Sequence, residues 1–242
     1  MRDTGMSLDG KRVVVIGGTS GIGFAVAELA STQGATVVVA SSAQANVTAA
    51  VGRLAGATGD TIDLRREGSV AAFFDRIGPF DHLAITAGDW NGAAFFAPTR
   101  DLDLALTREL LEVRFWGVLA AVKYAAPHIA PTGSITLTSG MLVHRPRMHA
   151  PMPTVVGGAI EHMARGIAMD LMPIRVNAVC PGLVLTEPVK QMPEAMLQSM
   201  VDPLPIPRTA SPAEAAKAYV YLMLNAYVTG QILPLDGGGM LI

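Results

Sequence analysis

The sequence predicts an α/β fold in which one domain, residues 1–242, forms a doubly wound parallel sheet with helices on both faces. Short runs of β-branched residues alternate with helical patterns along the chain, which is the rhythm of such folds. The runs are continuously apolar, as in strands that are covered on both faces. Half of the residues are hydrophobic and only 16% are charged, against about 25% in typical domains. A large buried core is therefore expected, and disorder is excluded.

The first part of the chain contains a strand, a helix and a second strand. Residues 13–16 are a short apolar run that ends in glycines, and a helical pattern follows them. Gly34 marks the end of that helix, and residues 36–40 form the second strand. The alternation continues, with strands expected at 82–86, 134–138, 175–179 and 231–235 and helices at 101–129, 154–172 and 212–225.

Composition excludes several classes of function. The net charge is −2, from 18 basic and 20 acidic residues, so the chain has no electrostatic footprint for nucleic acid or an anionic membrane. A single cysteine, Cys180, excludes an internal disulfide and a multi-cysteine metal site, and no metal is predicted. Residues 1–11 lack an apolar signal core and no apolar run reaches about 18 residues. We therefore expect a cytoplasmic protein.

A glycine-rich loop follows the first predicted strand. Residues 17–23 read Gly-Gly-Thr-Ser-Gly-Ile-Gly. Gly21 and Gly23 allow the backbone to approach a pyrophosphate, whose charge lies on amides at the positive end of the next helix. The spacing differs from the common dinucleotide pattern G-x-G-x-x-G, and a glycine-rich turn alone can be a tight connection. The position between a strand and a helix favours a nucleotide site.

The loop resembles the T-G-x-x-x-G-x-G turn of the classical short-chain dehydrogenase/reductase family, with Ile16 in place of the usual threonine. Other segments are similar to motifs of that family in the same order. They are Asp63-Leu64 (an adenine-contacting pair), Thr86-Ala87-Gly88 (the N-A-G segment, with threonine for asparagine), Ser139 (the catalytic serine), 175–182 with Thr186, and Thr229-Gly230 with 236–238. The matches extend through nearly the whole chain.

This resemblance implies a Rossmann-like fold, a nicotinamide nucleotide and a homodimer or homotetramer. The expected assembly helices are 101–129 and 154–172, which are unusually apolar; Phe115, Trp116, Val118, Leu119 and Val122 lie on the first. The expected cofactor-binding residues are Gly17, Thr19, Ser20, Gly21, Ile22, Gly23, Ser41, Ser42, Asp63, Leu64, Ala87, Gly88, Pro181, Gly182, Val184 and Thr186.

The end of the second predicted strand favours NADP(H) over NAD(H). A carboxylate about 20 residues beyond the glycine loop usually holds the ribose 2′-hydroxyl of NAD. Here the strand ends in Ser41 and Ser42, whose hydroxyls can donate to a 2′-phosphate. The alternative is that these serines only begin a loop. The cations considered for the phosphate are Lys11, Arg12, Arg65 and Arg66.

The predicted active site lacks the general acid that the resemblance implies. In the family a tyrosine lies about thirteen residues after the serine and a lysine four residues further, which here gives Met152 and Val156. The family's helix asparagine aligns with Arg114. A thioether and an isopropyl group cannot donate a proton, and loss of a general acid costs about 10²- to 10⁴-fold in rate. A non-standard active site follows.

Three residues are candidates for the missing chemistry. Arg114 lies on the apolar face of its predicted helix, where a guanidinium is costly unless paired. It either approaches Ser139, or reaches the surface or pairs with a nearby glutamate. His149 is preferred over His144 as an acid, because it lies closer to Met152 and an imidazole changes charge near neutral pH; the alternative is a solvated histidine. Ser139 itself can orient a substrate.

The substrate side of the chain is apolar. Residues 184–210 carry several prolines and align with the family's substrate lid, and Met192, Met196 and Met200 have the spacing of one helical face. A helix that packs only on its own subunit is the alternative. Further apolar candidates are Trp90, Phe95 and Phe96. A small hydrophobic substrate is expected.

The leading hypothesis is an NADP(H)-dependent oxidoreductase that transfers hydride to or from a small hydrophobic carbonyl, imine or conjugated substrate. Activated acceptors are favoured because they need less help from an acid. Two alternatives use the same fold: a non-redox enzyme for cyclisation, isomerisation or elimination, and a nucleotide-sensing protein without catalysis.

Overall fold

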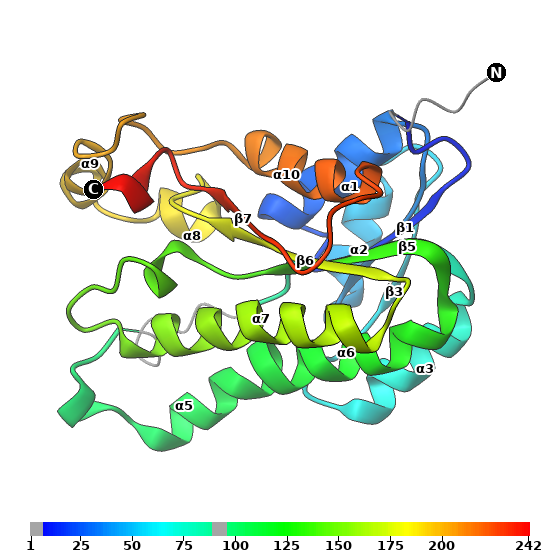
Figure 1. Cartoon of the computed structure of the whole chain (residues 1–242), viewed down its shortest axis with the longest axis horizontal. Coiled ribbons are helices and arrows are strands. Elements are labelled where there is room, and N and C mark those ends of the chain that lie inside the picture. The colour runs from blue at the N-terminus through cyan, green and yellow to red at the C-terminus, as the bar shows by residue number, and fades with distance from the viewer. Residues whose placement is uncertain (1–6, 89–95) are drawn as a thin grey trace.

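The computed structural model describes residues 7–88 and 96–242, which contain a seven-stranded sheet (Figure 1). The strand order is β3-β2-β1-β4-β5-β6-β7 and all neighbours are parallel. This confirms the predicted doubly wound sheet. The strands are β1 (Arg12–Ile16), β2 (Thr36–Ser41), β3 (Thr58–Thr61), β4 (Phe80–Ile85), β5 (Ile129–Thr138), β6 (Arg175–Pro181) and β7 (Ile232–Leu235).

Helices connect the strands. They are α1 (Gly21–Thr32), α2 (Gln44–Val51), α3 (Glu67–Ile77), α5 (Leu104–Leu111), α6 (Val118–Ala125), α7 (Pro151–Asp170), α8 (Glu187–Lys190), α9 (Glu194–Val201) and α10 (Pro212–Leu224). Sequence analysis had not found β3, α2 or α3. Strand β3 reads Thr-Gly-Asp-Thr and lies at the sheet edge, so it lacks the apolar run that marks the buried strands. Among the helices of the described residues, none combines the length and apolarity that crossing a membrane requires.

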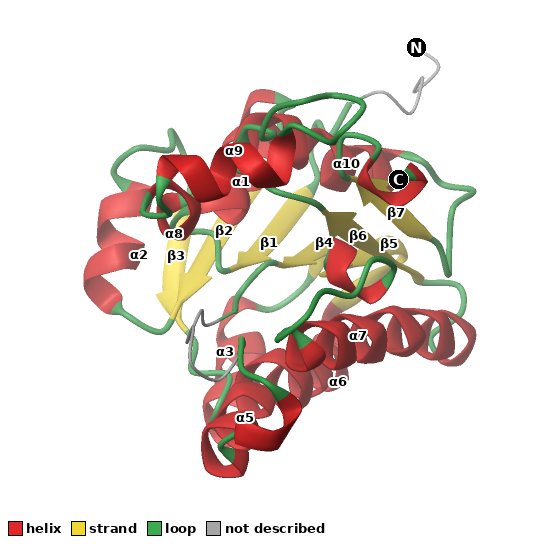
Figure 2. Ribbon diagram, turned by 90° about the vertical axis from the view of Figure 1, so that its left-hand side faces the viewer, coloured by secondary structure: helices red, strands yellow, loops and turns green. Residues whose placement is uncertain are grey.

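Helices cover both faces of the sheet. Figure 2 shows α3, α5, α6 and α7 on one side and α1 and α10 on the other. Successive residues of β1 enter different cores: Val13 and Val15 pack in the core beneath α1 and α10, and Val14 and Ile16 pack in the core of α3, α6 and α7. Because both faces of β1 are buried, the strand reads as a continuous apolar run and not as an alternation of apolar and polar residues.

The long helix predicted over 101–129 is interrupted. After α5 the chain forms a π-helical segment, Glu112–Gly117, before α6 begins. Wider π turns change the direction of the side chains they carry and are frequent at functional sites. The predicted end of the helix is also wrong, because α6 stops at Ala125 and β5 already begins at Ile129.

The strand order reverses between β1 and β4. Strand β1 pairs with β2 on one side and with β4 on the other, and Ile16 lies level with Ala40 and Ile85. The connections that follow β1 and β4 therefore leave in opposite directions and open a crevice at the carboxyl edge of the sheet, where ligands of such folds bind.

The motif in β6 secures the last helix. Arg175 is buried, and its guanidinium donates to the carbonyl oxygens of Leu222 (2.5 Å) and Met223 (2.8 Å) at the end of α10. Asn177 donates to the carbonyl of Val228 at 2.9 Å. A guanidinium beside the final carbonyls of a helix satisfies acceptors that the helix leaves open. These two residues are structural and do not line the crevice.

Candidate active site

A cavity of about 420 Å³ occupies the carboxyl edge of the sheet. It is bounded by the segments that follow β1, β2, β3, β4, β5 and β6. All sixteen residues that the sequence predicted for cofactor binding line this cavity. Lining residues that sequence analysis did not assign to the cofactor include Asn46, Arg65, Val113, Leu183, Pro188 and Val189.

The glycine loop forms a backbone cradle. Gly17 and Gly21 have φ angles of 85° and 51°, which favour glycine. A Cβ on Gly23 would lie 2.1 Å from the carbonyl oxygen of Gly17, so the turn closes only without one. Because α1 begins at Gly21, its unpaired amides and the positive helix end face the loop. This arrangement fits a pyrophosphate.

Thr86 holds the loop against β4. Its hydroxyl lies 3.2 Å from the carbonyl oxygen of Ile16 and 3.3 Å from that of Gly17, and can donate to either. Gly17 also approaches Ala87 closely, since a Cβ on Gly17 would lie 2.6 Å from the Ala87 amide nitrogen. The threonine that replaces asparagine in the N-A-G segment thus joins the two loops on either side of the crevice.

The adenine end of the cavity contains one carboxylate among its described lining residues, that of Asp63. Asp63 accepts hydrogen bonds from the Arg65 amide (3.0 Å) and from Nε of Arg66 (2.8 Å). Partial burial opposes ionisation, but these bonds and the two arginine charges outweigh it and hold the pKa of Asp63 below its usual value. Ser41 and Ser42 line the same end.

The predicted phosphate-binding cations differ in their positions. Lys11 pairs with Asp81 at 3.1 Å and Arg12 donates to the carbonyl of Pro79 at 2.7 Å. Both lie at the amino edge of the sheet, away from the cavity, so they are not available to the cofactor. Arg66 is engaged by Asp63, whereas Arg65 lines the cavity.

Arg114 lies at the opposite end of the cavity. It is half-buried on the π-helical segment and lines the cavity. Its guanidinium packs against Gly88, where an added Cβ would lie 2.5 Å from the Arg114 Cζ. Arg114 and Ser139 thus line the same cavity, as one of the two alternatives for Arg114 requires.

Helix α7 presents a different face from the one predicted. Met152 and Val156 are buried against Leu110 in a small apolar cluster. The residue that faces Ser139 is Gly157, where a Cβ would lie 3.4 Å from the Ser139 Oγ. Met152 and Val156, the positions inferred by counting from the serine, are therefore not among the described residues that line the cavity. Neither position carries a lysine.

Glu161 is the residue that sequence analysis missed. Its carboxylate is buried with 2% side-chain exposure, and Oε1 accepts a 2.7 Å hydrogen bond from the Ser139 hydroxyl. Nε2 of His144 lies 2.9 Å from the same oxygen. A signal was present, because Glu161 lies four residues after Gly157 and next to Ile160, on the buried face of α7. A charged residue at such a position needs partners.

The position of His149 does not support the prediction that this residue acts as the acid. It is exposed, has a φ of 62° and is not among the described residues that line the cavity. His144, which sequence analysis ranked lower, is the histidine that contacts the Ser139 network through Glu161. The 3-10 turn Met141–Val143 places it there.

Among the described residues, which include all four tyrosines and all four lysines, neither type lines the cavity. Tyr219 is buried on α10 and its hydroxyl lies 2.7 Å from Oγ1 of Thr138. Burial raises the pKa of Tyr219, so it stays a neutral phenol. Tyr124 donates to Glu67, and Tyr227 is fully exposed.

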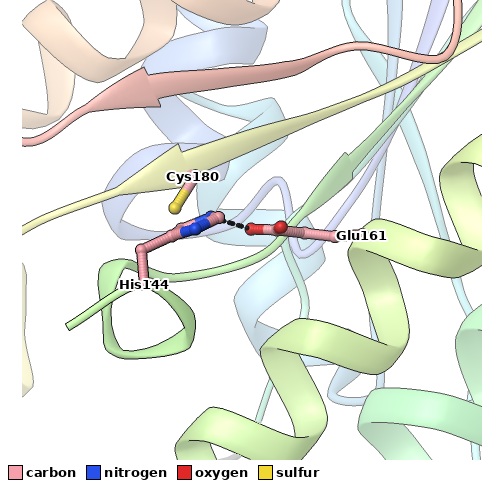
Figure 3. A group of neighbouring side chains, drawn as sticks. All are labelled: His144, Glu161 and Cys180. Atoms are coloured by element: carbon pink, nitrogen blue, oxygen red, sulfur yellow. Dashed lines mark hydrogen bonds and ion pairs between the residues drawn. The ribbon is translucent and has the colours of Figure 1, made fainter. Parts of the chain in front are cut away.

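His144, Glu161 and Cys180 form a group of neighbouring donor atoms (Figure 3). One ligand atom of each lies within 4.8 Å of the others. The His144–Glu161 hydrogen bond already joins two of them. Burial, followed by the charge of Glu161, raises the pKa of Cys180 to about 12, whereas a metal ligand must be a thiolate. The geometry is that of a hydrogen-bonded cluster.

The predicted lid supplies part of the cavity wall. Leu183, Pro188 and Val189 line the cavity. Leu183 precedes α8, Pro188 and Val189 lie on α8, and α9 follows. Met192 precedes α9, so the three methionines do not form one helical face as predicted; Met196, on α9, is 52% exposed. Trp90 and Phe95 lie outside the described residues. Phe96 is 47% exposed.

Comparisons with known proteins identify the family of this chain. A family model described as enoyl-(acyl carrier protein) reductase matches residues 17–239. The short-chain dehydrogenase/reductase ucsE of Acremonium sp is 35% identical over 98% of each chain. A small-chain dehydrogenase solved in complex with NADPH has a TM-score of 0.82 and 32% identity, covering 97% of this chain and 100% of the other. The MalC reductase/Diels-Alderase from Malbranchea aurantiaca has a TM-score of 0.90 and 30% identity, covering 98% and 99%. The chain belongs to the short-chain dehydrogenase/reductase family of oxidoreductases.

Proposed function

We propose that this protein is an NADP(H)-dependent oxidoreductase with a non-standard active site. It transfers a hydride to or from a small hydrophobic carbonyl, imine or conjugated substrate. One observation carries the proposal: a single cavity joins the backbone cradle at Gly21 and Gly23 to the polar side chains of Ser139 and Arg114. A nucleotide that lies on the cradle thus extends toward a polar site.

The residues at the adenine end support NADP(H) over NAD(H). Ser41 and Ser42 offer hydroxyl donors and Arg65 adds a cation, while the Asp63 carboxylate is occupied by hydrogen bonds. A 2′-phosphate meets no unpaired carboxylate among the described lining residues there. The similar dehydrogenase solved with NADPH is consistent with this preference.

At the other end, the chain's own residues bind and polarise the substrate. When bound, the nicotinamide supplies or accepts the hydride. The Arg114 guanidinium offers fixed donors to a developing negative charge, and Ser139 orients the reacting group. Val113, Leu183 and Val189 form apolar walls, which suit an uncharged hydrophobic substrate.

The test has two steps. The melting temperature is measured with NADPH and with NADH, because a ligand of the folded state stabilises it by mass action. NADPH oxidation is then followed with a panel of ketones, imines and enones. A larger shift with NADPH and oxidation with activated acceptors are expected. An equal or larger shift with NADH contradicts the cofactor preference, and no oxidation with any acceptor contradicts the redox function.

A second candidate is cyclisation in the same cavity. The relative that supports it is the MalC protein, whose name pairs reductase with Diels-Alderase and whose fold is very similar. Arg114 can polarise a dienophile without any net redox change. Tight NADPH binding without oxidation, together with faster cyclisation of a diene and dienophile pair, favours this candidate.

We also propose that the protein is a homodimer or homotetramer. On the π-helical segment, α6 and α7, the apolar side chains of Trp116, Leu119, Val155 and Met169 are 55%, 36%, 55% and 68% exposed. Large exposed apolar side chains support an interaction surface on these helices. Val118 and Val122, on the same helix, pack in the core of their own subunit. A 25 kDa particle by light scattering at micromolar concentration contradicts the assembly.

A further inference from the structure

The proposed function leaves the source of the proton open. Arg114 polarises, but a guanidinium does not give up its proton in proteins. No tyrosine or lysine reaches the cavity from the described residues, and these include all of both types. Ser139 is a hydroxyl at the cavity, but a serine alone needs a partner that takes or returns its proton.

Glu161 is placed to be that partner. Ser139 Oγ and Glu161 Oε1 lie 2.7 Å apart, so a protonated Glu161 can donate to Oγ while the Ser139 hydroxyl hydrogen turns toward a substrate. The carboxylate is buried at 2% exposure on α7, and a buried carboxylate without partners would be costly. Glu161 can therefore exchange a proton only with the groups that are hydrogen-bonded to it, which are Ser139 and His144.

His144 connects the carboxylate with solvent. Its Nε2 lies 2.9 Å from the oxygen that Ser139 contacts, and its side chain is 36% exposed. Figure 3 shows the imidazole and the carboxylate pointing toward each other from the loop before α7 and from α7 itself. The three groups thus run without a gap from the cavity to the surface.

We propose that Ser139, Glu161 and His144 form a proton path that replaces the missing general acid. Ser139 is the catalytic residue that touches the substrate, and Glu161 and His144 are positioning residues that act through it. This inference rests on the proposed function, since it needs a reduction that consumes a proton.

The steps balance. In reduction, a hydride bonds to the substrate carbon, and the electron pair of its C=O, C=N or C=C bond moves to the far atom. That atom takes the proton of the Ser139 hydroxyl. Ser139 regains a proton from the Glu161 carboxyl, Glu161 regains one from the His144 imidazolium, and His144 regains one from water. Oxidation follows the reverse order, and the proton leaves through His144.

Two other groups surround the path. Cys180 of β6 approaches both Ser139 and Glu161, and Asp236 after β7 acts electrostatically on Cys180. The Cys180 thiol stays protonated near neutral pH, because burial raises its pKa to about 12. The other members of the path with ionisable side chains are Glu161 and His144.

The test uses the full chain and three variants. Glu161→Gln keeps the shape of the side chain but cannot carry the proton, and His144→Gln removes the link to water. The matched control is His162→Gln, because His162 is exposed and adjacent to Glu161 on α7. NADPH binding is measured by melting temperature, single-turnover NADPH oxidation is measured from pH 5 to 9, and carboxyl bands are recorded by pH-difference infrared spectroscopy without cofactor.

We expect wild-type reduction to slow as pH rises, because the imidazolium supplies the proton. Glu161→Gln should lower the single-turnover rate by about 100-fold or more and flatten the profile. His144→Gln should also flatten the pH profile. Its single-turnover rate should fall by less than that of Glu161→Gln, since water can still supply Glu161 with a proton by a less direct route. In the wild type, the carboxyl band should change at the pH at which the single-turnover rate begins to fall. This infrared change should be absent in Glu161→Gln. His162→Gln should match the wild type in every measurement, and all three variants should keep the NADPH shift.

The outcomes separate the two proposals. If the wild type oxidises NADPH while Glu161→Gln and His144→Gln keep its rate and its pH profile, the proton path is wrong and the proposed function stands. If the wild type binds NADPH but reduces no acceptor, the proposed redox function is wrong. The proton path is then wrong as well, because it requires a reduction that consumes a proton. Should Glu161→Gln fail to fold, the more exposed His144→Gln decides, because an unaltered pH profile in that variant also overturns the path.

Discussion

The two ends of the cavity are built in different ways. At the glycine loop the binding groups are backbone amides and close contacts between Gly17, Gly21 and Gly23. At helix α7 the functional groups are side chains, and those of Ser139 and Glu161 come from different elements. A backbone cradle depends on conformation and tolerates Ile16 and Thr86 in place of the family's usual residues. A proton-transfer site depends on the chemistry of each side chain. When a side chain that donates the proton is replaced by one that cannot, another group must supply the proton.

The largest expected effect tests which residues of α7 face the cavity. Val156→Lys should destabilise the fold by about 3–5 kcal/mol, because Val156 is 4% exposed in an apolar cluster and the new charge has no partner there. Denaturant unfolding measures the change.

The neighbouring position is the control for this substitution. Val155 is 55% exposed, so Val155→Lys should change the free energy of unfolding by no more than about 0.5 kcal/mol. If Val156→Lys were equally neutral, Val156 would face the open cavity and not the apolar cluster.

The glycine cradle is tested by Gly21→Val. The φ of 51° disfavours any side chain, and a Cβ would point to within 3.2 Å of Thr186 across the cavity. We expect the variant to lose the stabilisation by NADPH, which is about 2.7 kcal/mol at a ligand concentration 100 times the Kd.

Gly68→Val is the matched control for the cradle variant. A Cβ on Gly68 meets nothing within 4 Å on α3, so the NADPH shift should persist. Retention of the full shift by Gly21→Val would show that the nucleotide does not lie on this loop.

Cofactor preference is tested by Ser41→Asp. A carboxylate at the end of β2 repels a 2′-phosphate and accepts a hydrogen bond from a 2′-hydroxyl. The ratio of the Kd values for NADPH and NADH should rise by about 10- to 100-fold, as expected for like charges a few ångströms apart. Ser41→Asn has the same shape without the charge and should leave the ratio nearly unchanged; an equal shift in both variants argues against the electrostatic explanation.

The smallest expected effect concerns Cys180. Burial and then the charge of Glu161 raise the pKa of this thiol to about 12, so Glu161→Gln should lower the pKa and speed alkylation at pH 9. The increase should stay below about tenfold, because burial is the larger cause and remains. Mass spectrometry reports the rate cleanly, since the chain has one cysteine. An unchanged rate would mean that Glu161 carries no negative charge beside Cys180.

The nucleotide end of the cavity was predictable residue by residue. The glycine spacing, the Asp63-Leu64 pair and the 181–186 segment all line the cavity as expected. Local patterns predicted the glycine loop, because it follows the apolar run of β1 and precedes a helix. The Asp63-Leu64 pair and the 181–186 segment were predicted from the family resemblance, since β3 has no apolar run that marks it in the sequence.

The α7 end was predictable only in part. The absence of a suitable tyrosine and lysine was visible, and so was the unusual position of Arg114. The burial of Met152 and Val156 and the approach of Gly157 to Ser139 were not, because the turn of Met141–Val143 and the loop after it set how α7 packs. His149 was preferred over His144 because it lies closer to Met152 in the sequence, whereas the fold brings His144 to Glu161.

The sequence by itself determined the family, the parallel sheet and the nucleotide cradle, because these depend on apolar runs and glycines that act within a few residues of one another. Only the tertiary structure decided that Ser139, Glu161 and His144 meet, and that Arg114 turns inward from a π-helical segment. Those contacts join a strand end, a loop and the middle of a helix. Their geometry depends on how the whole helix packs, which no local pattern encodes.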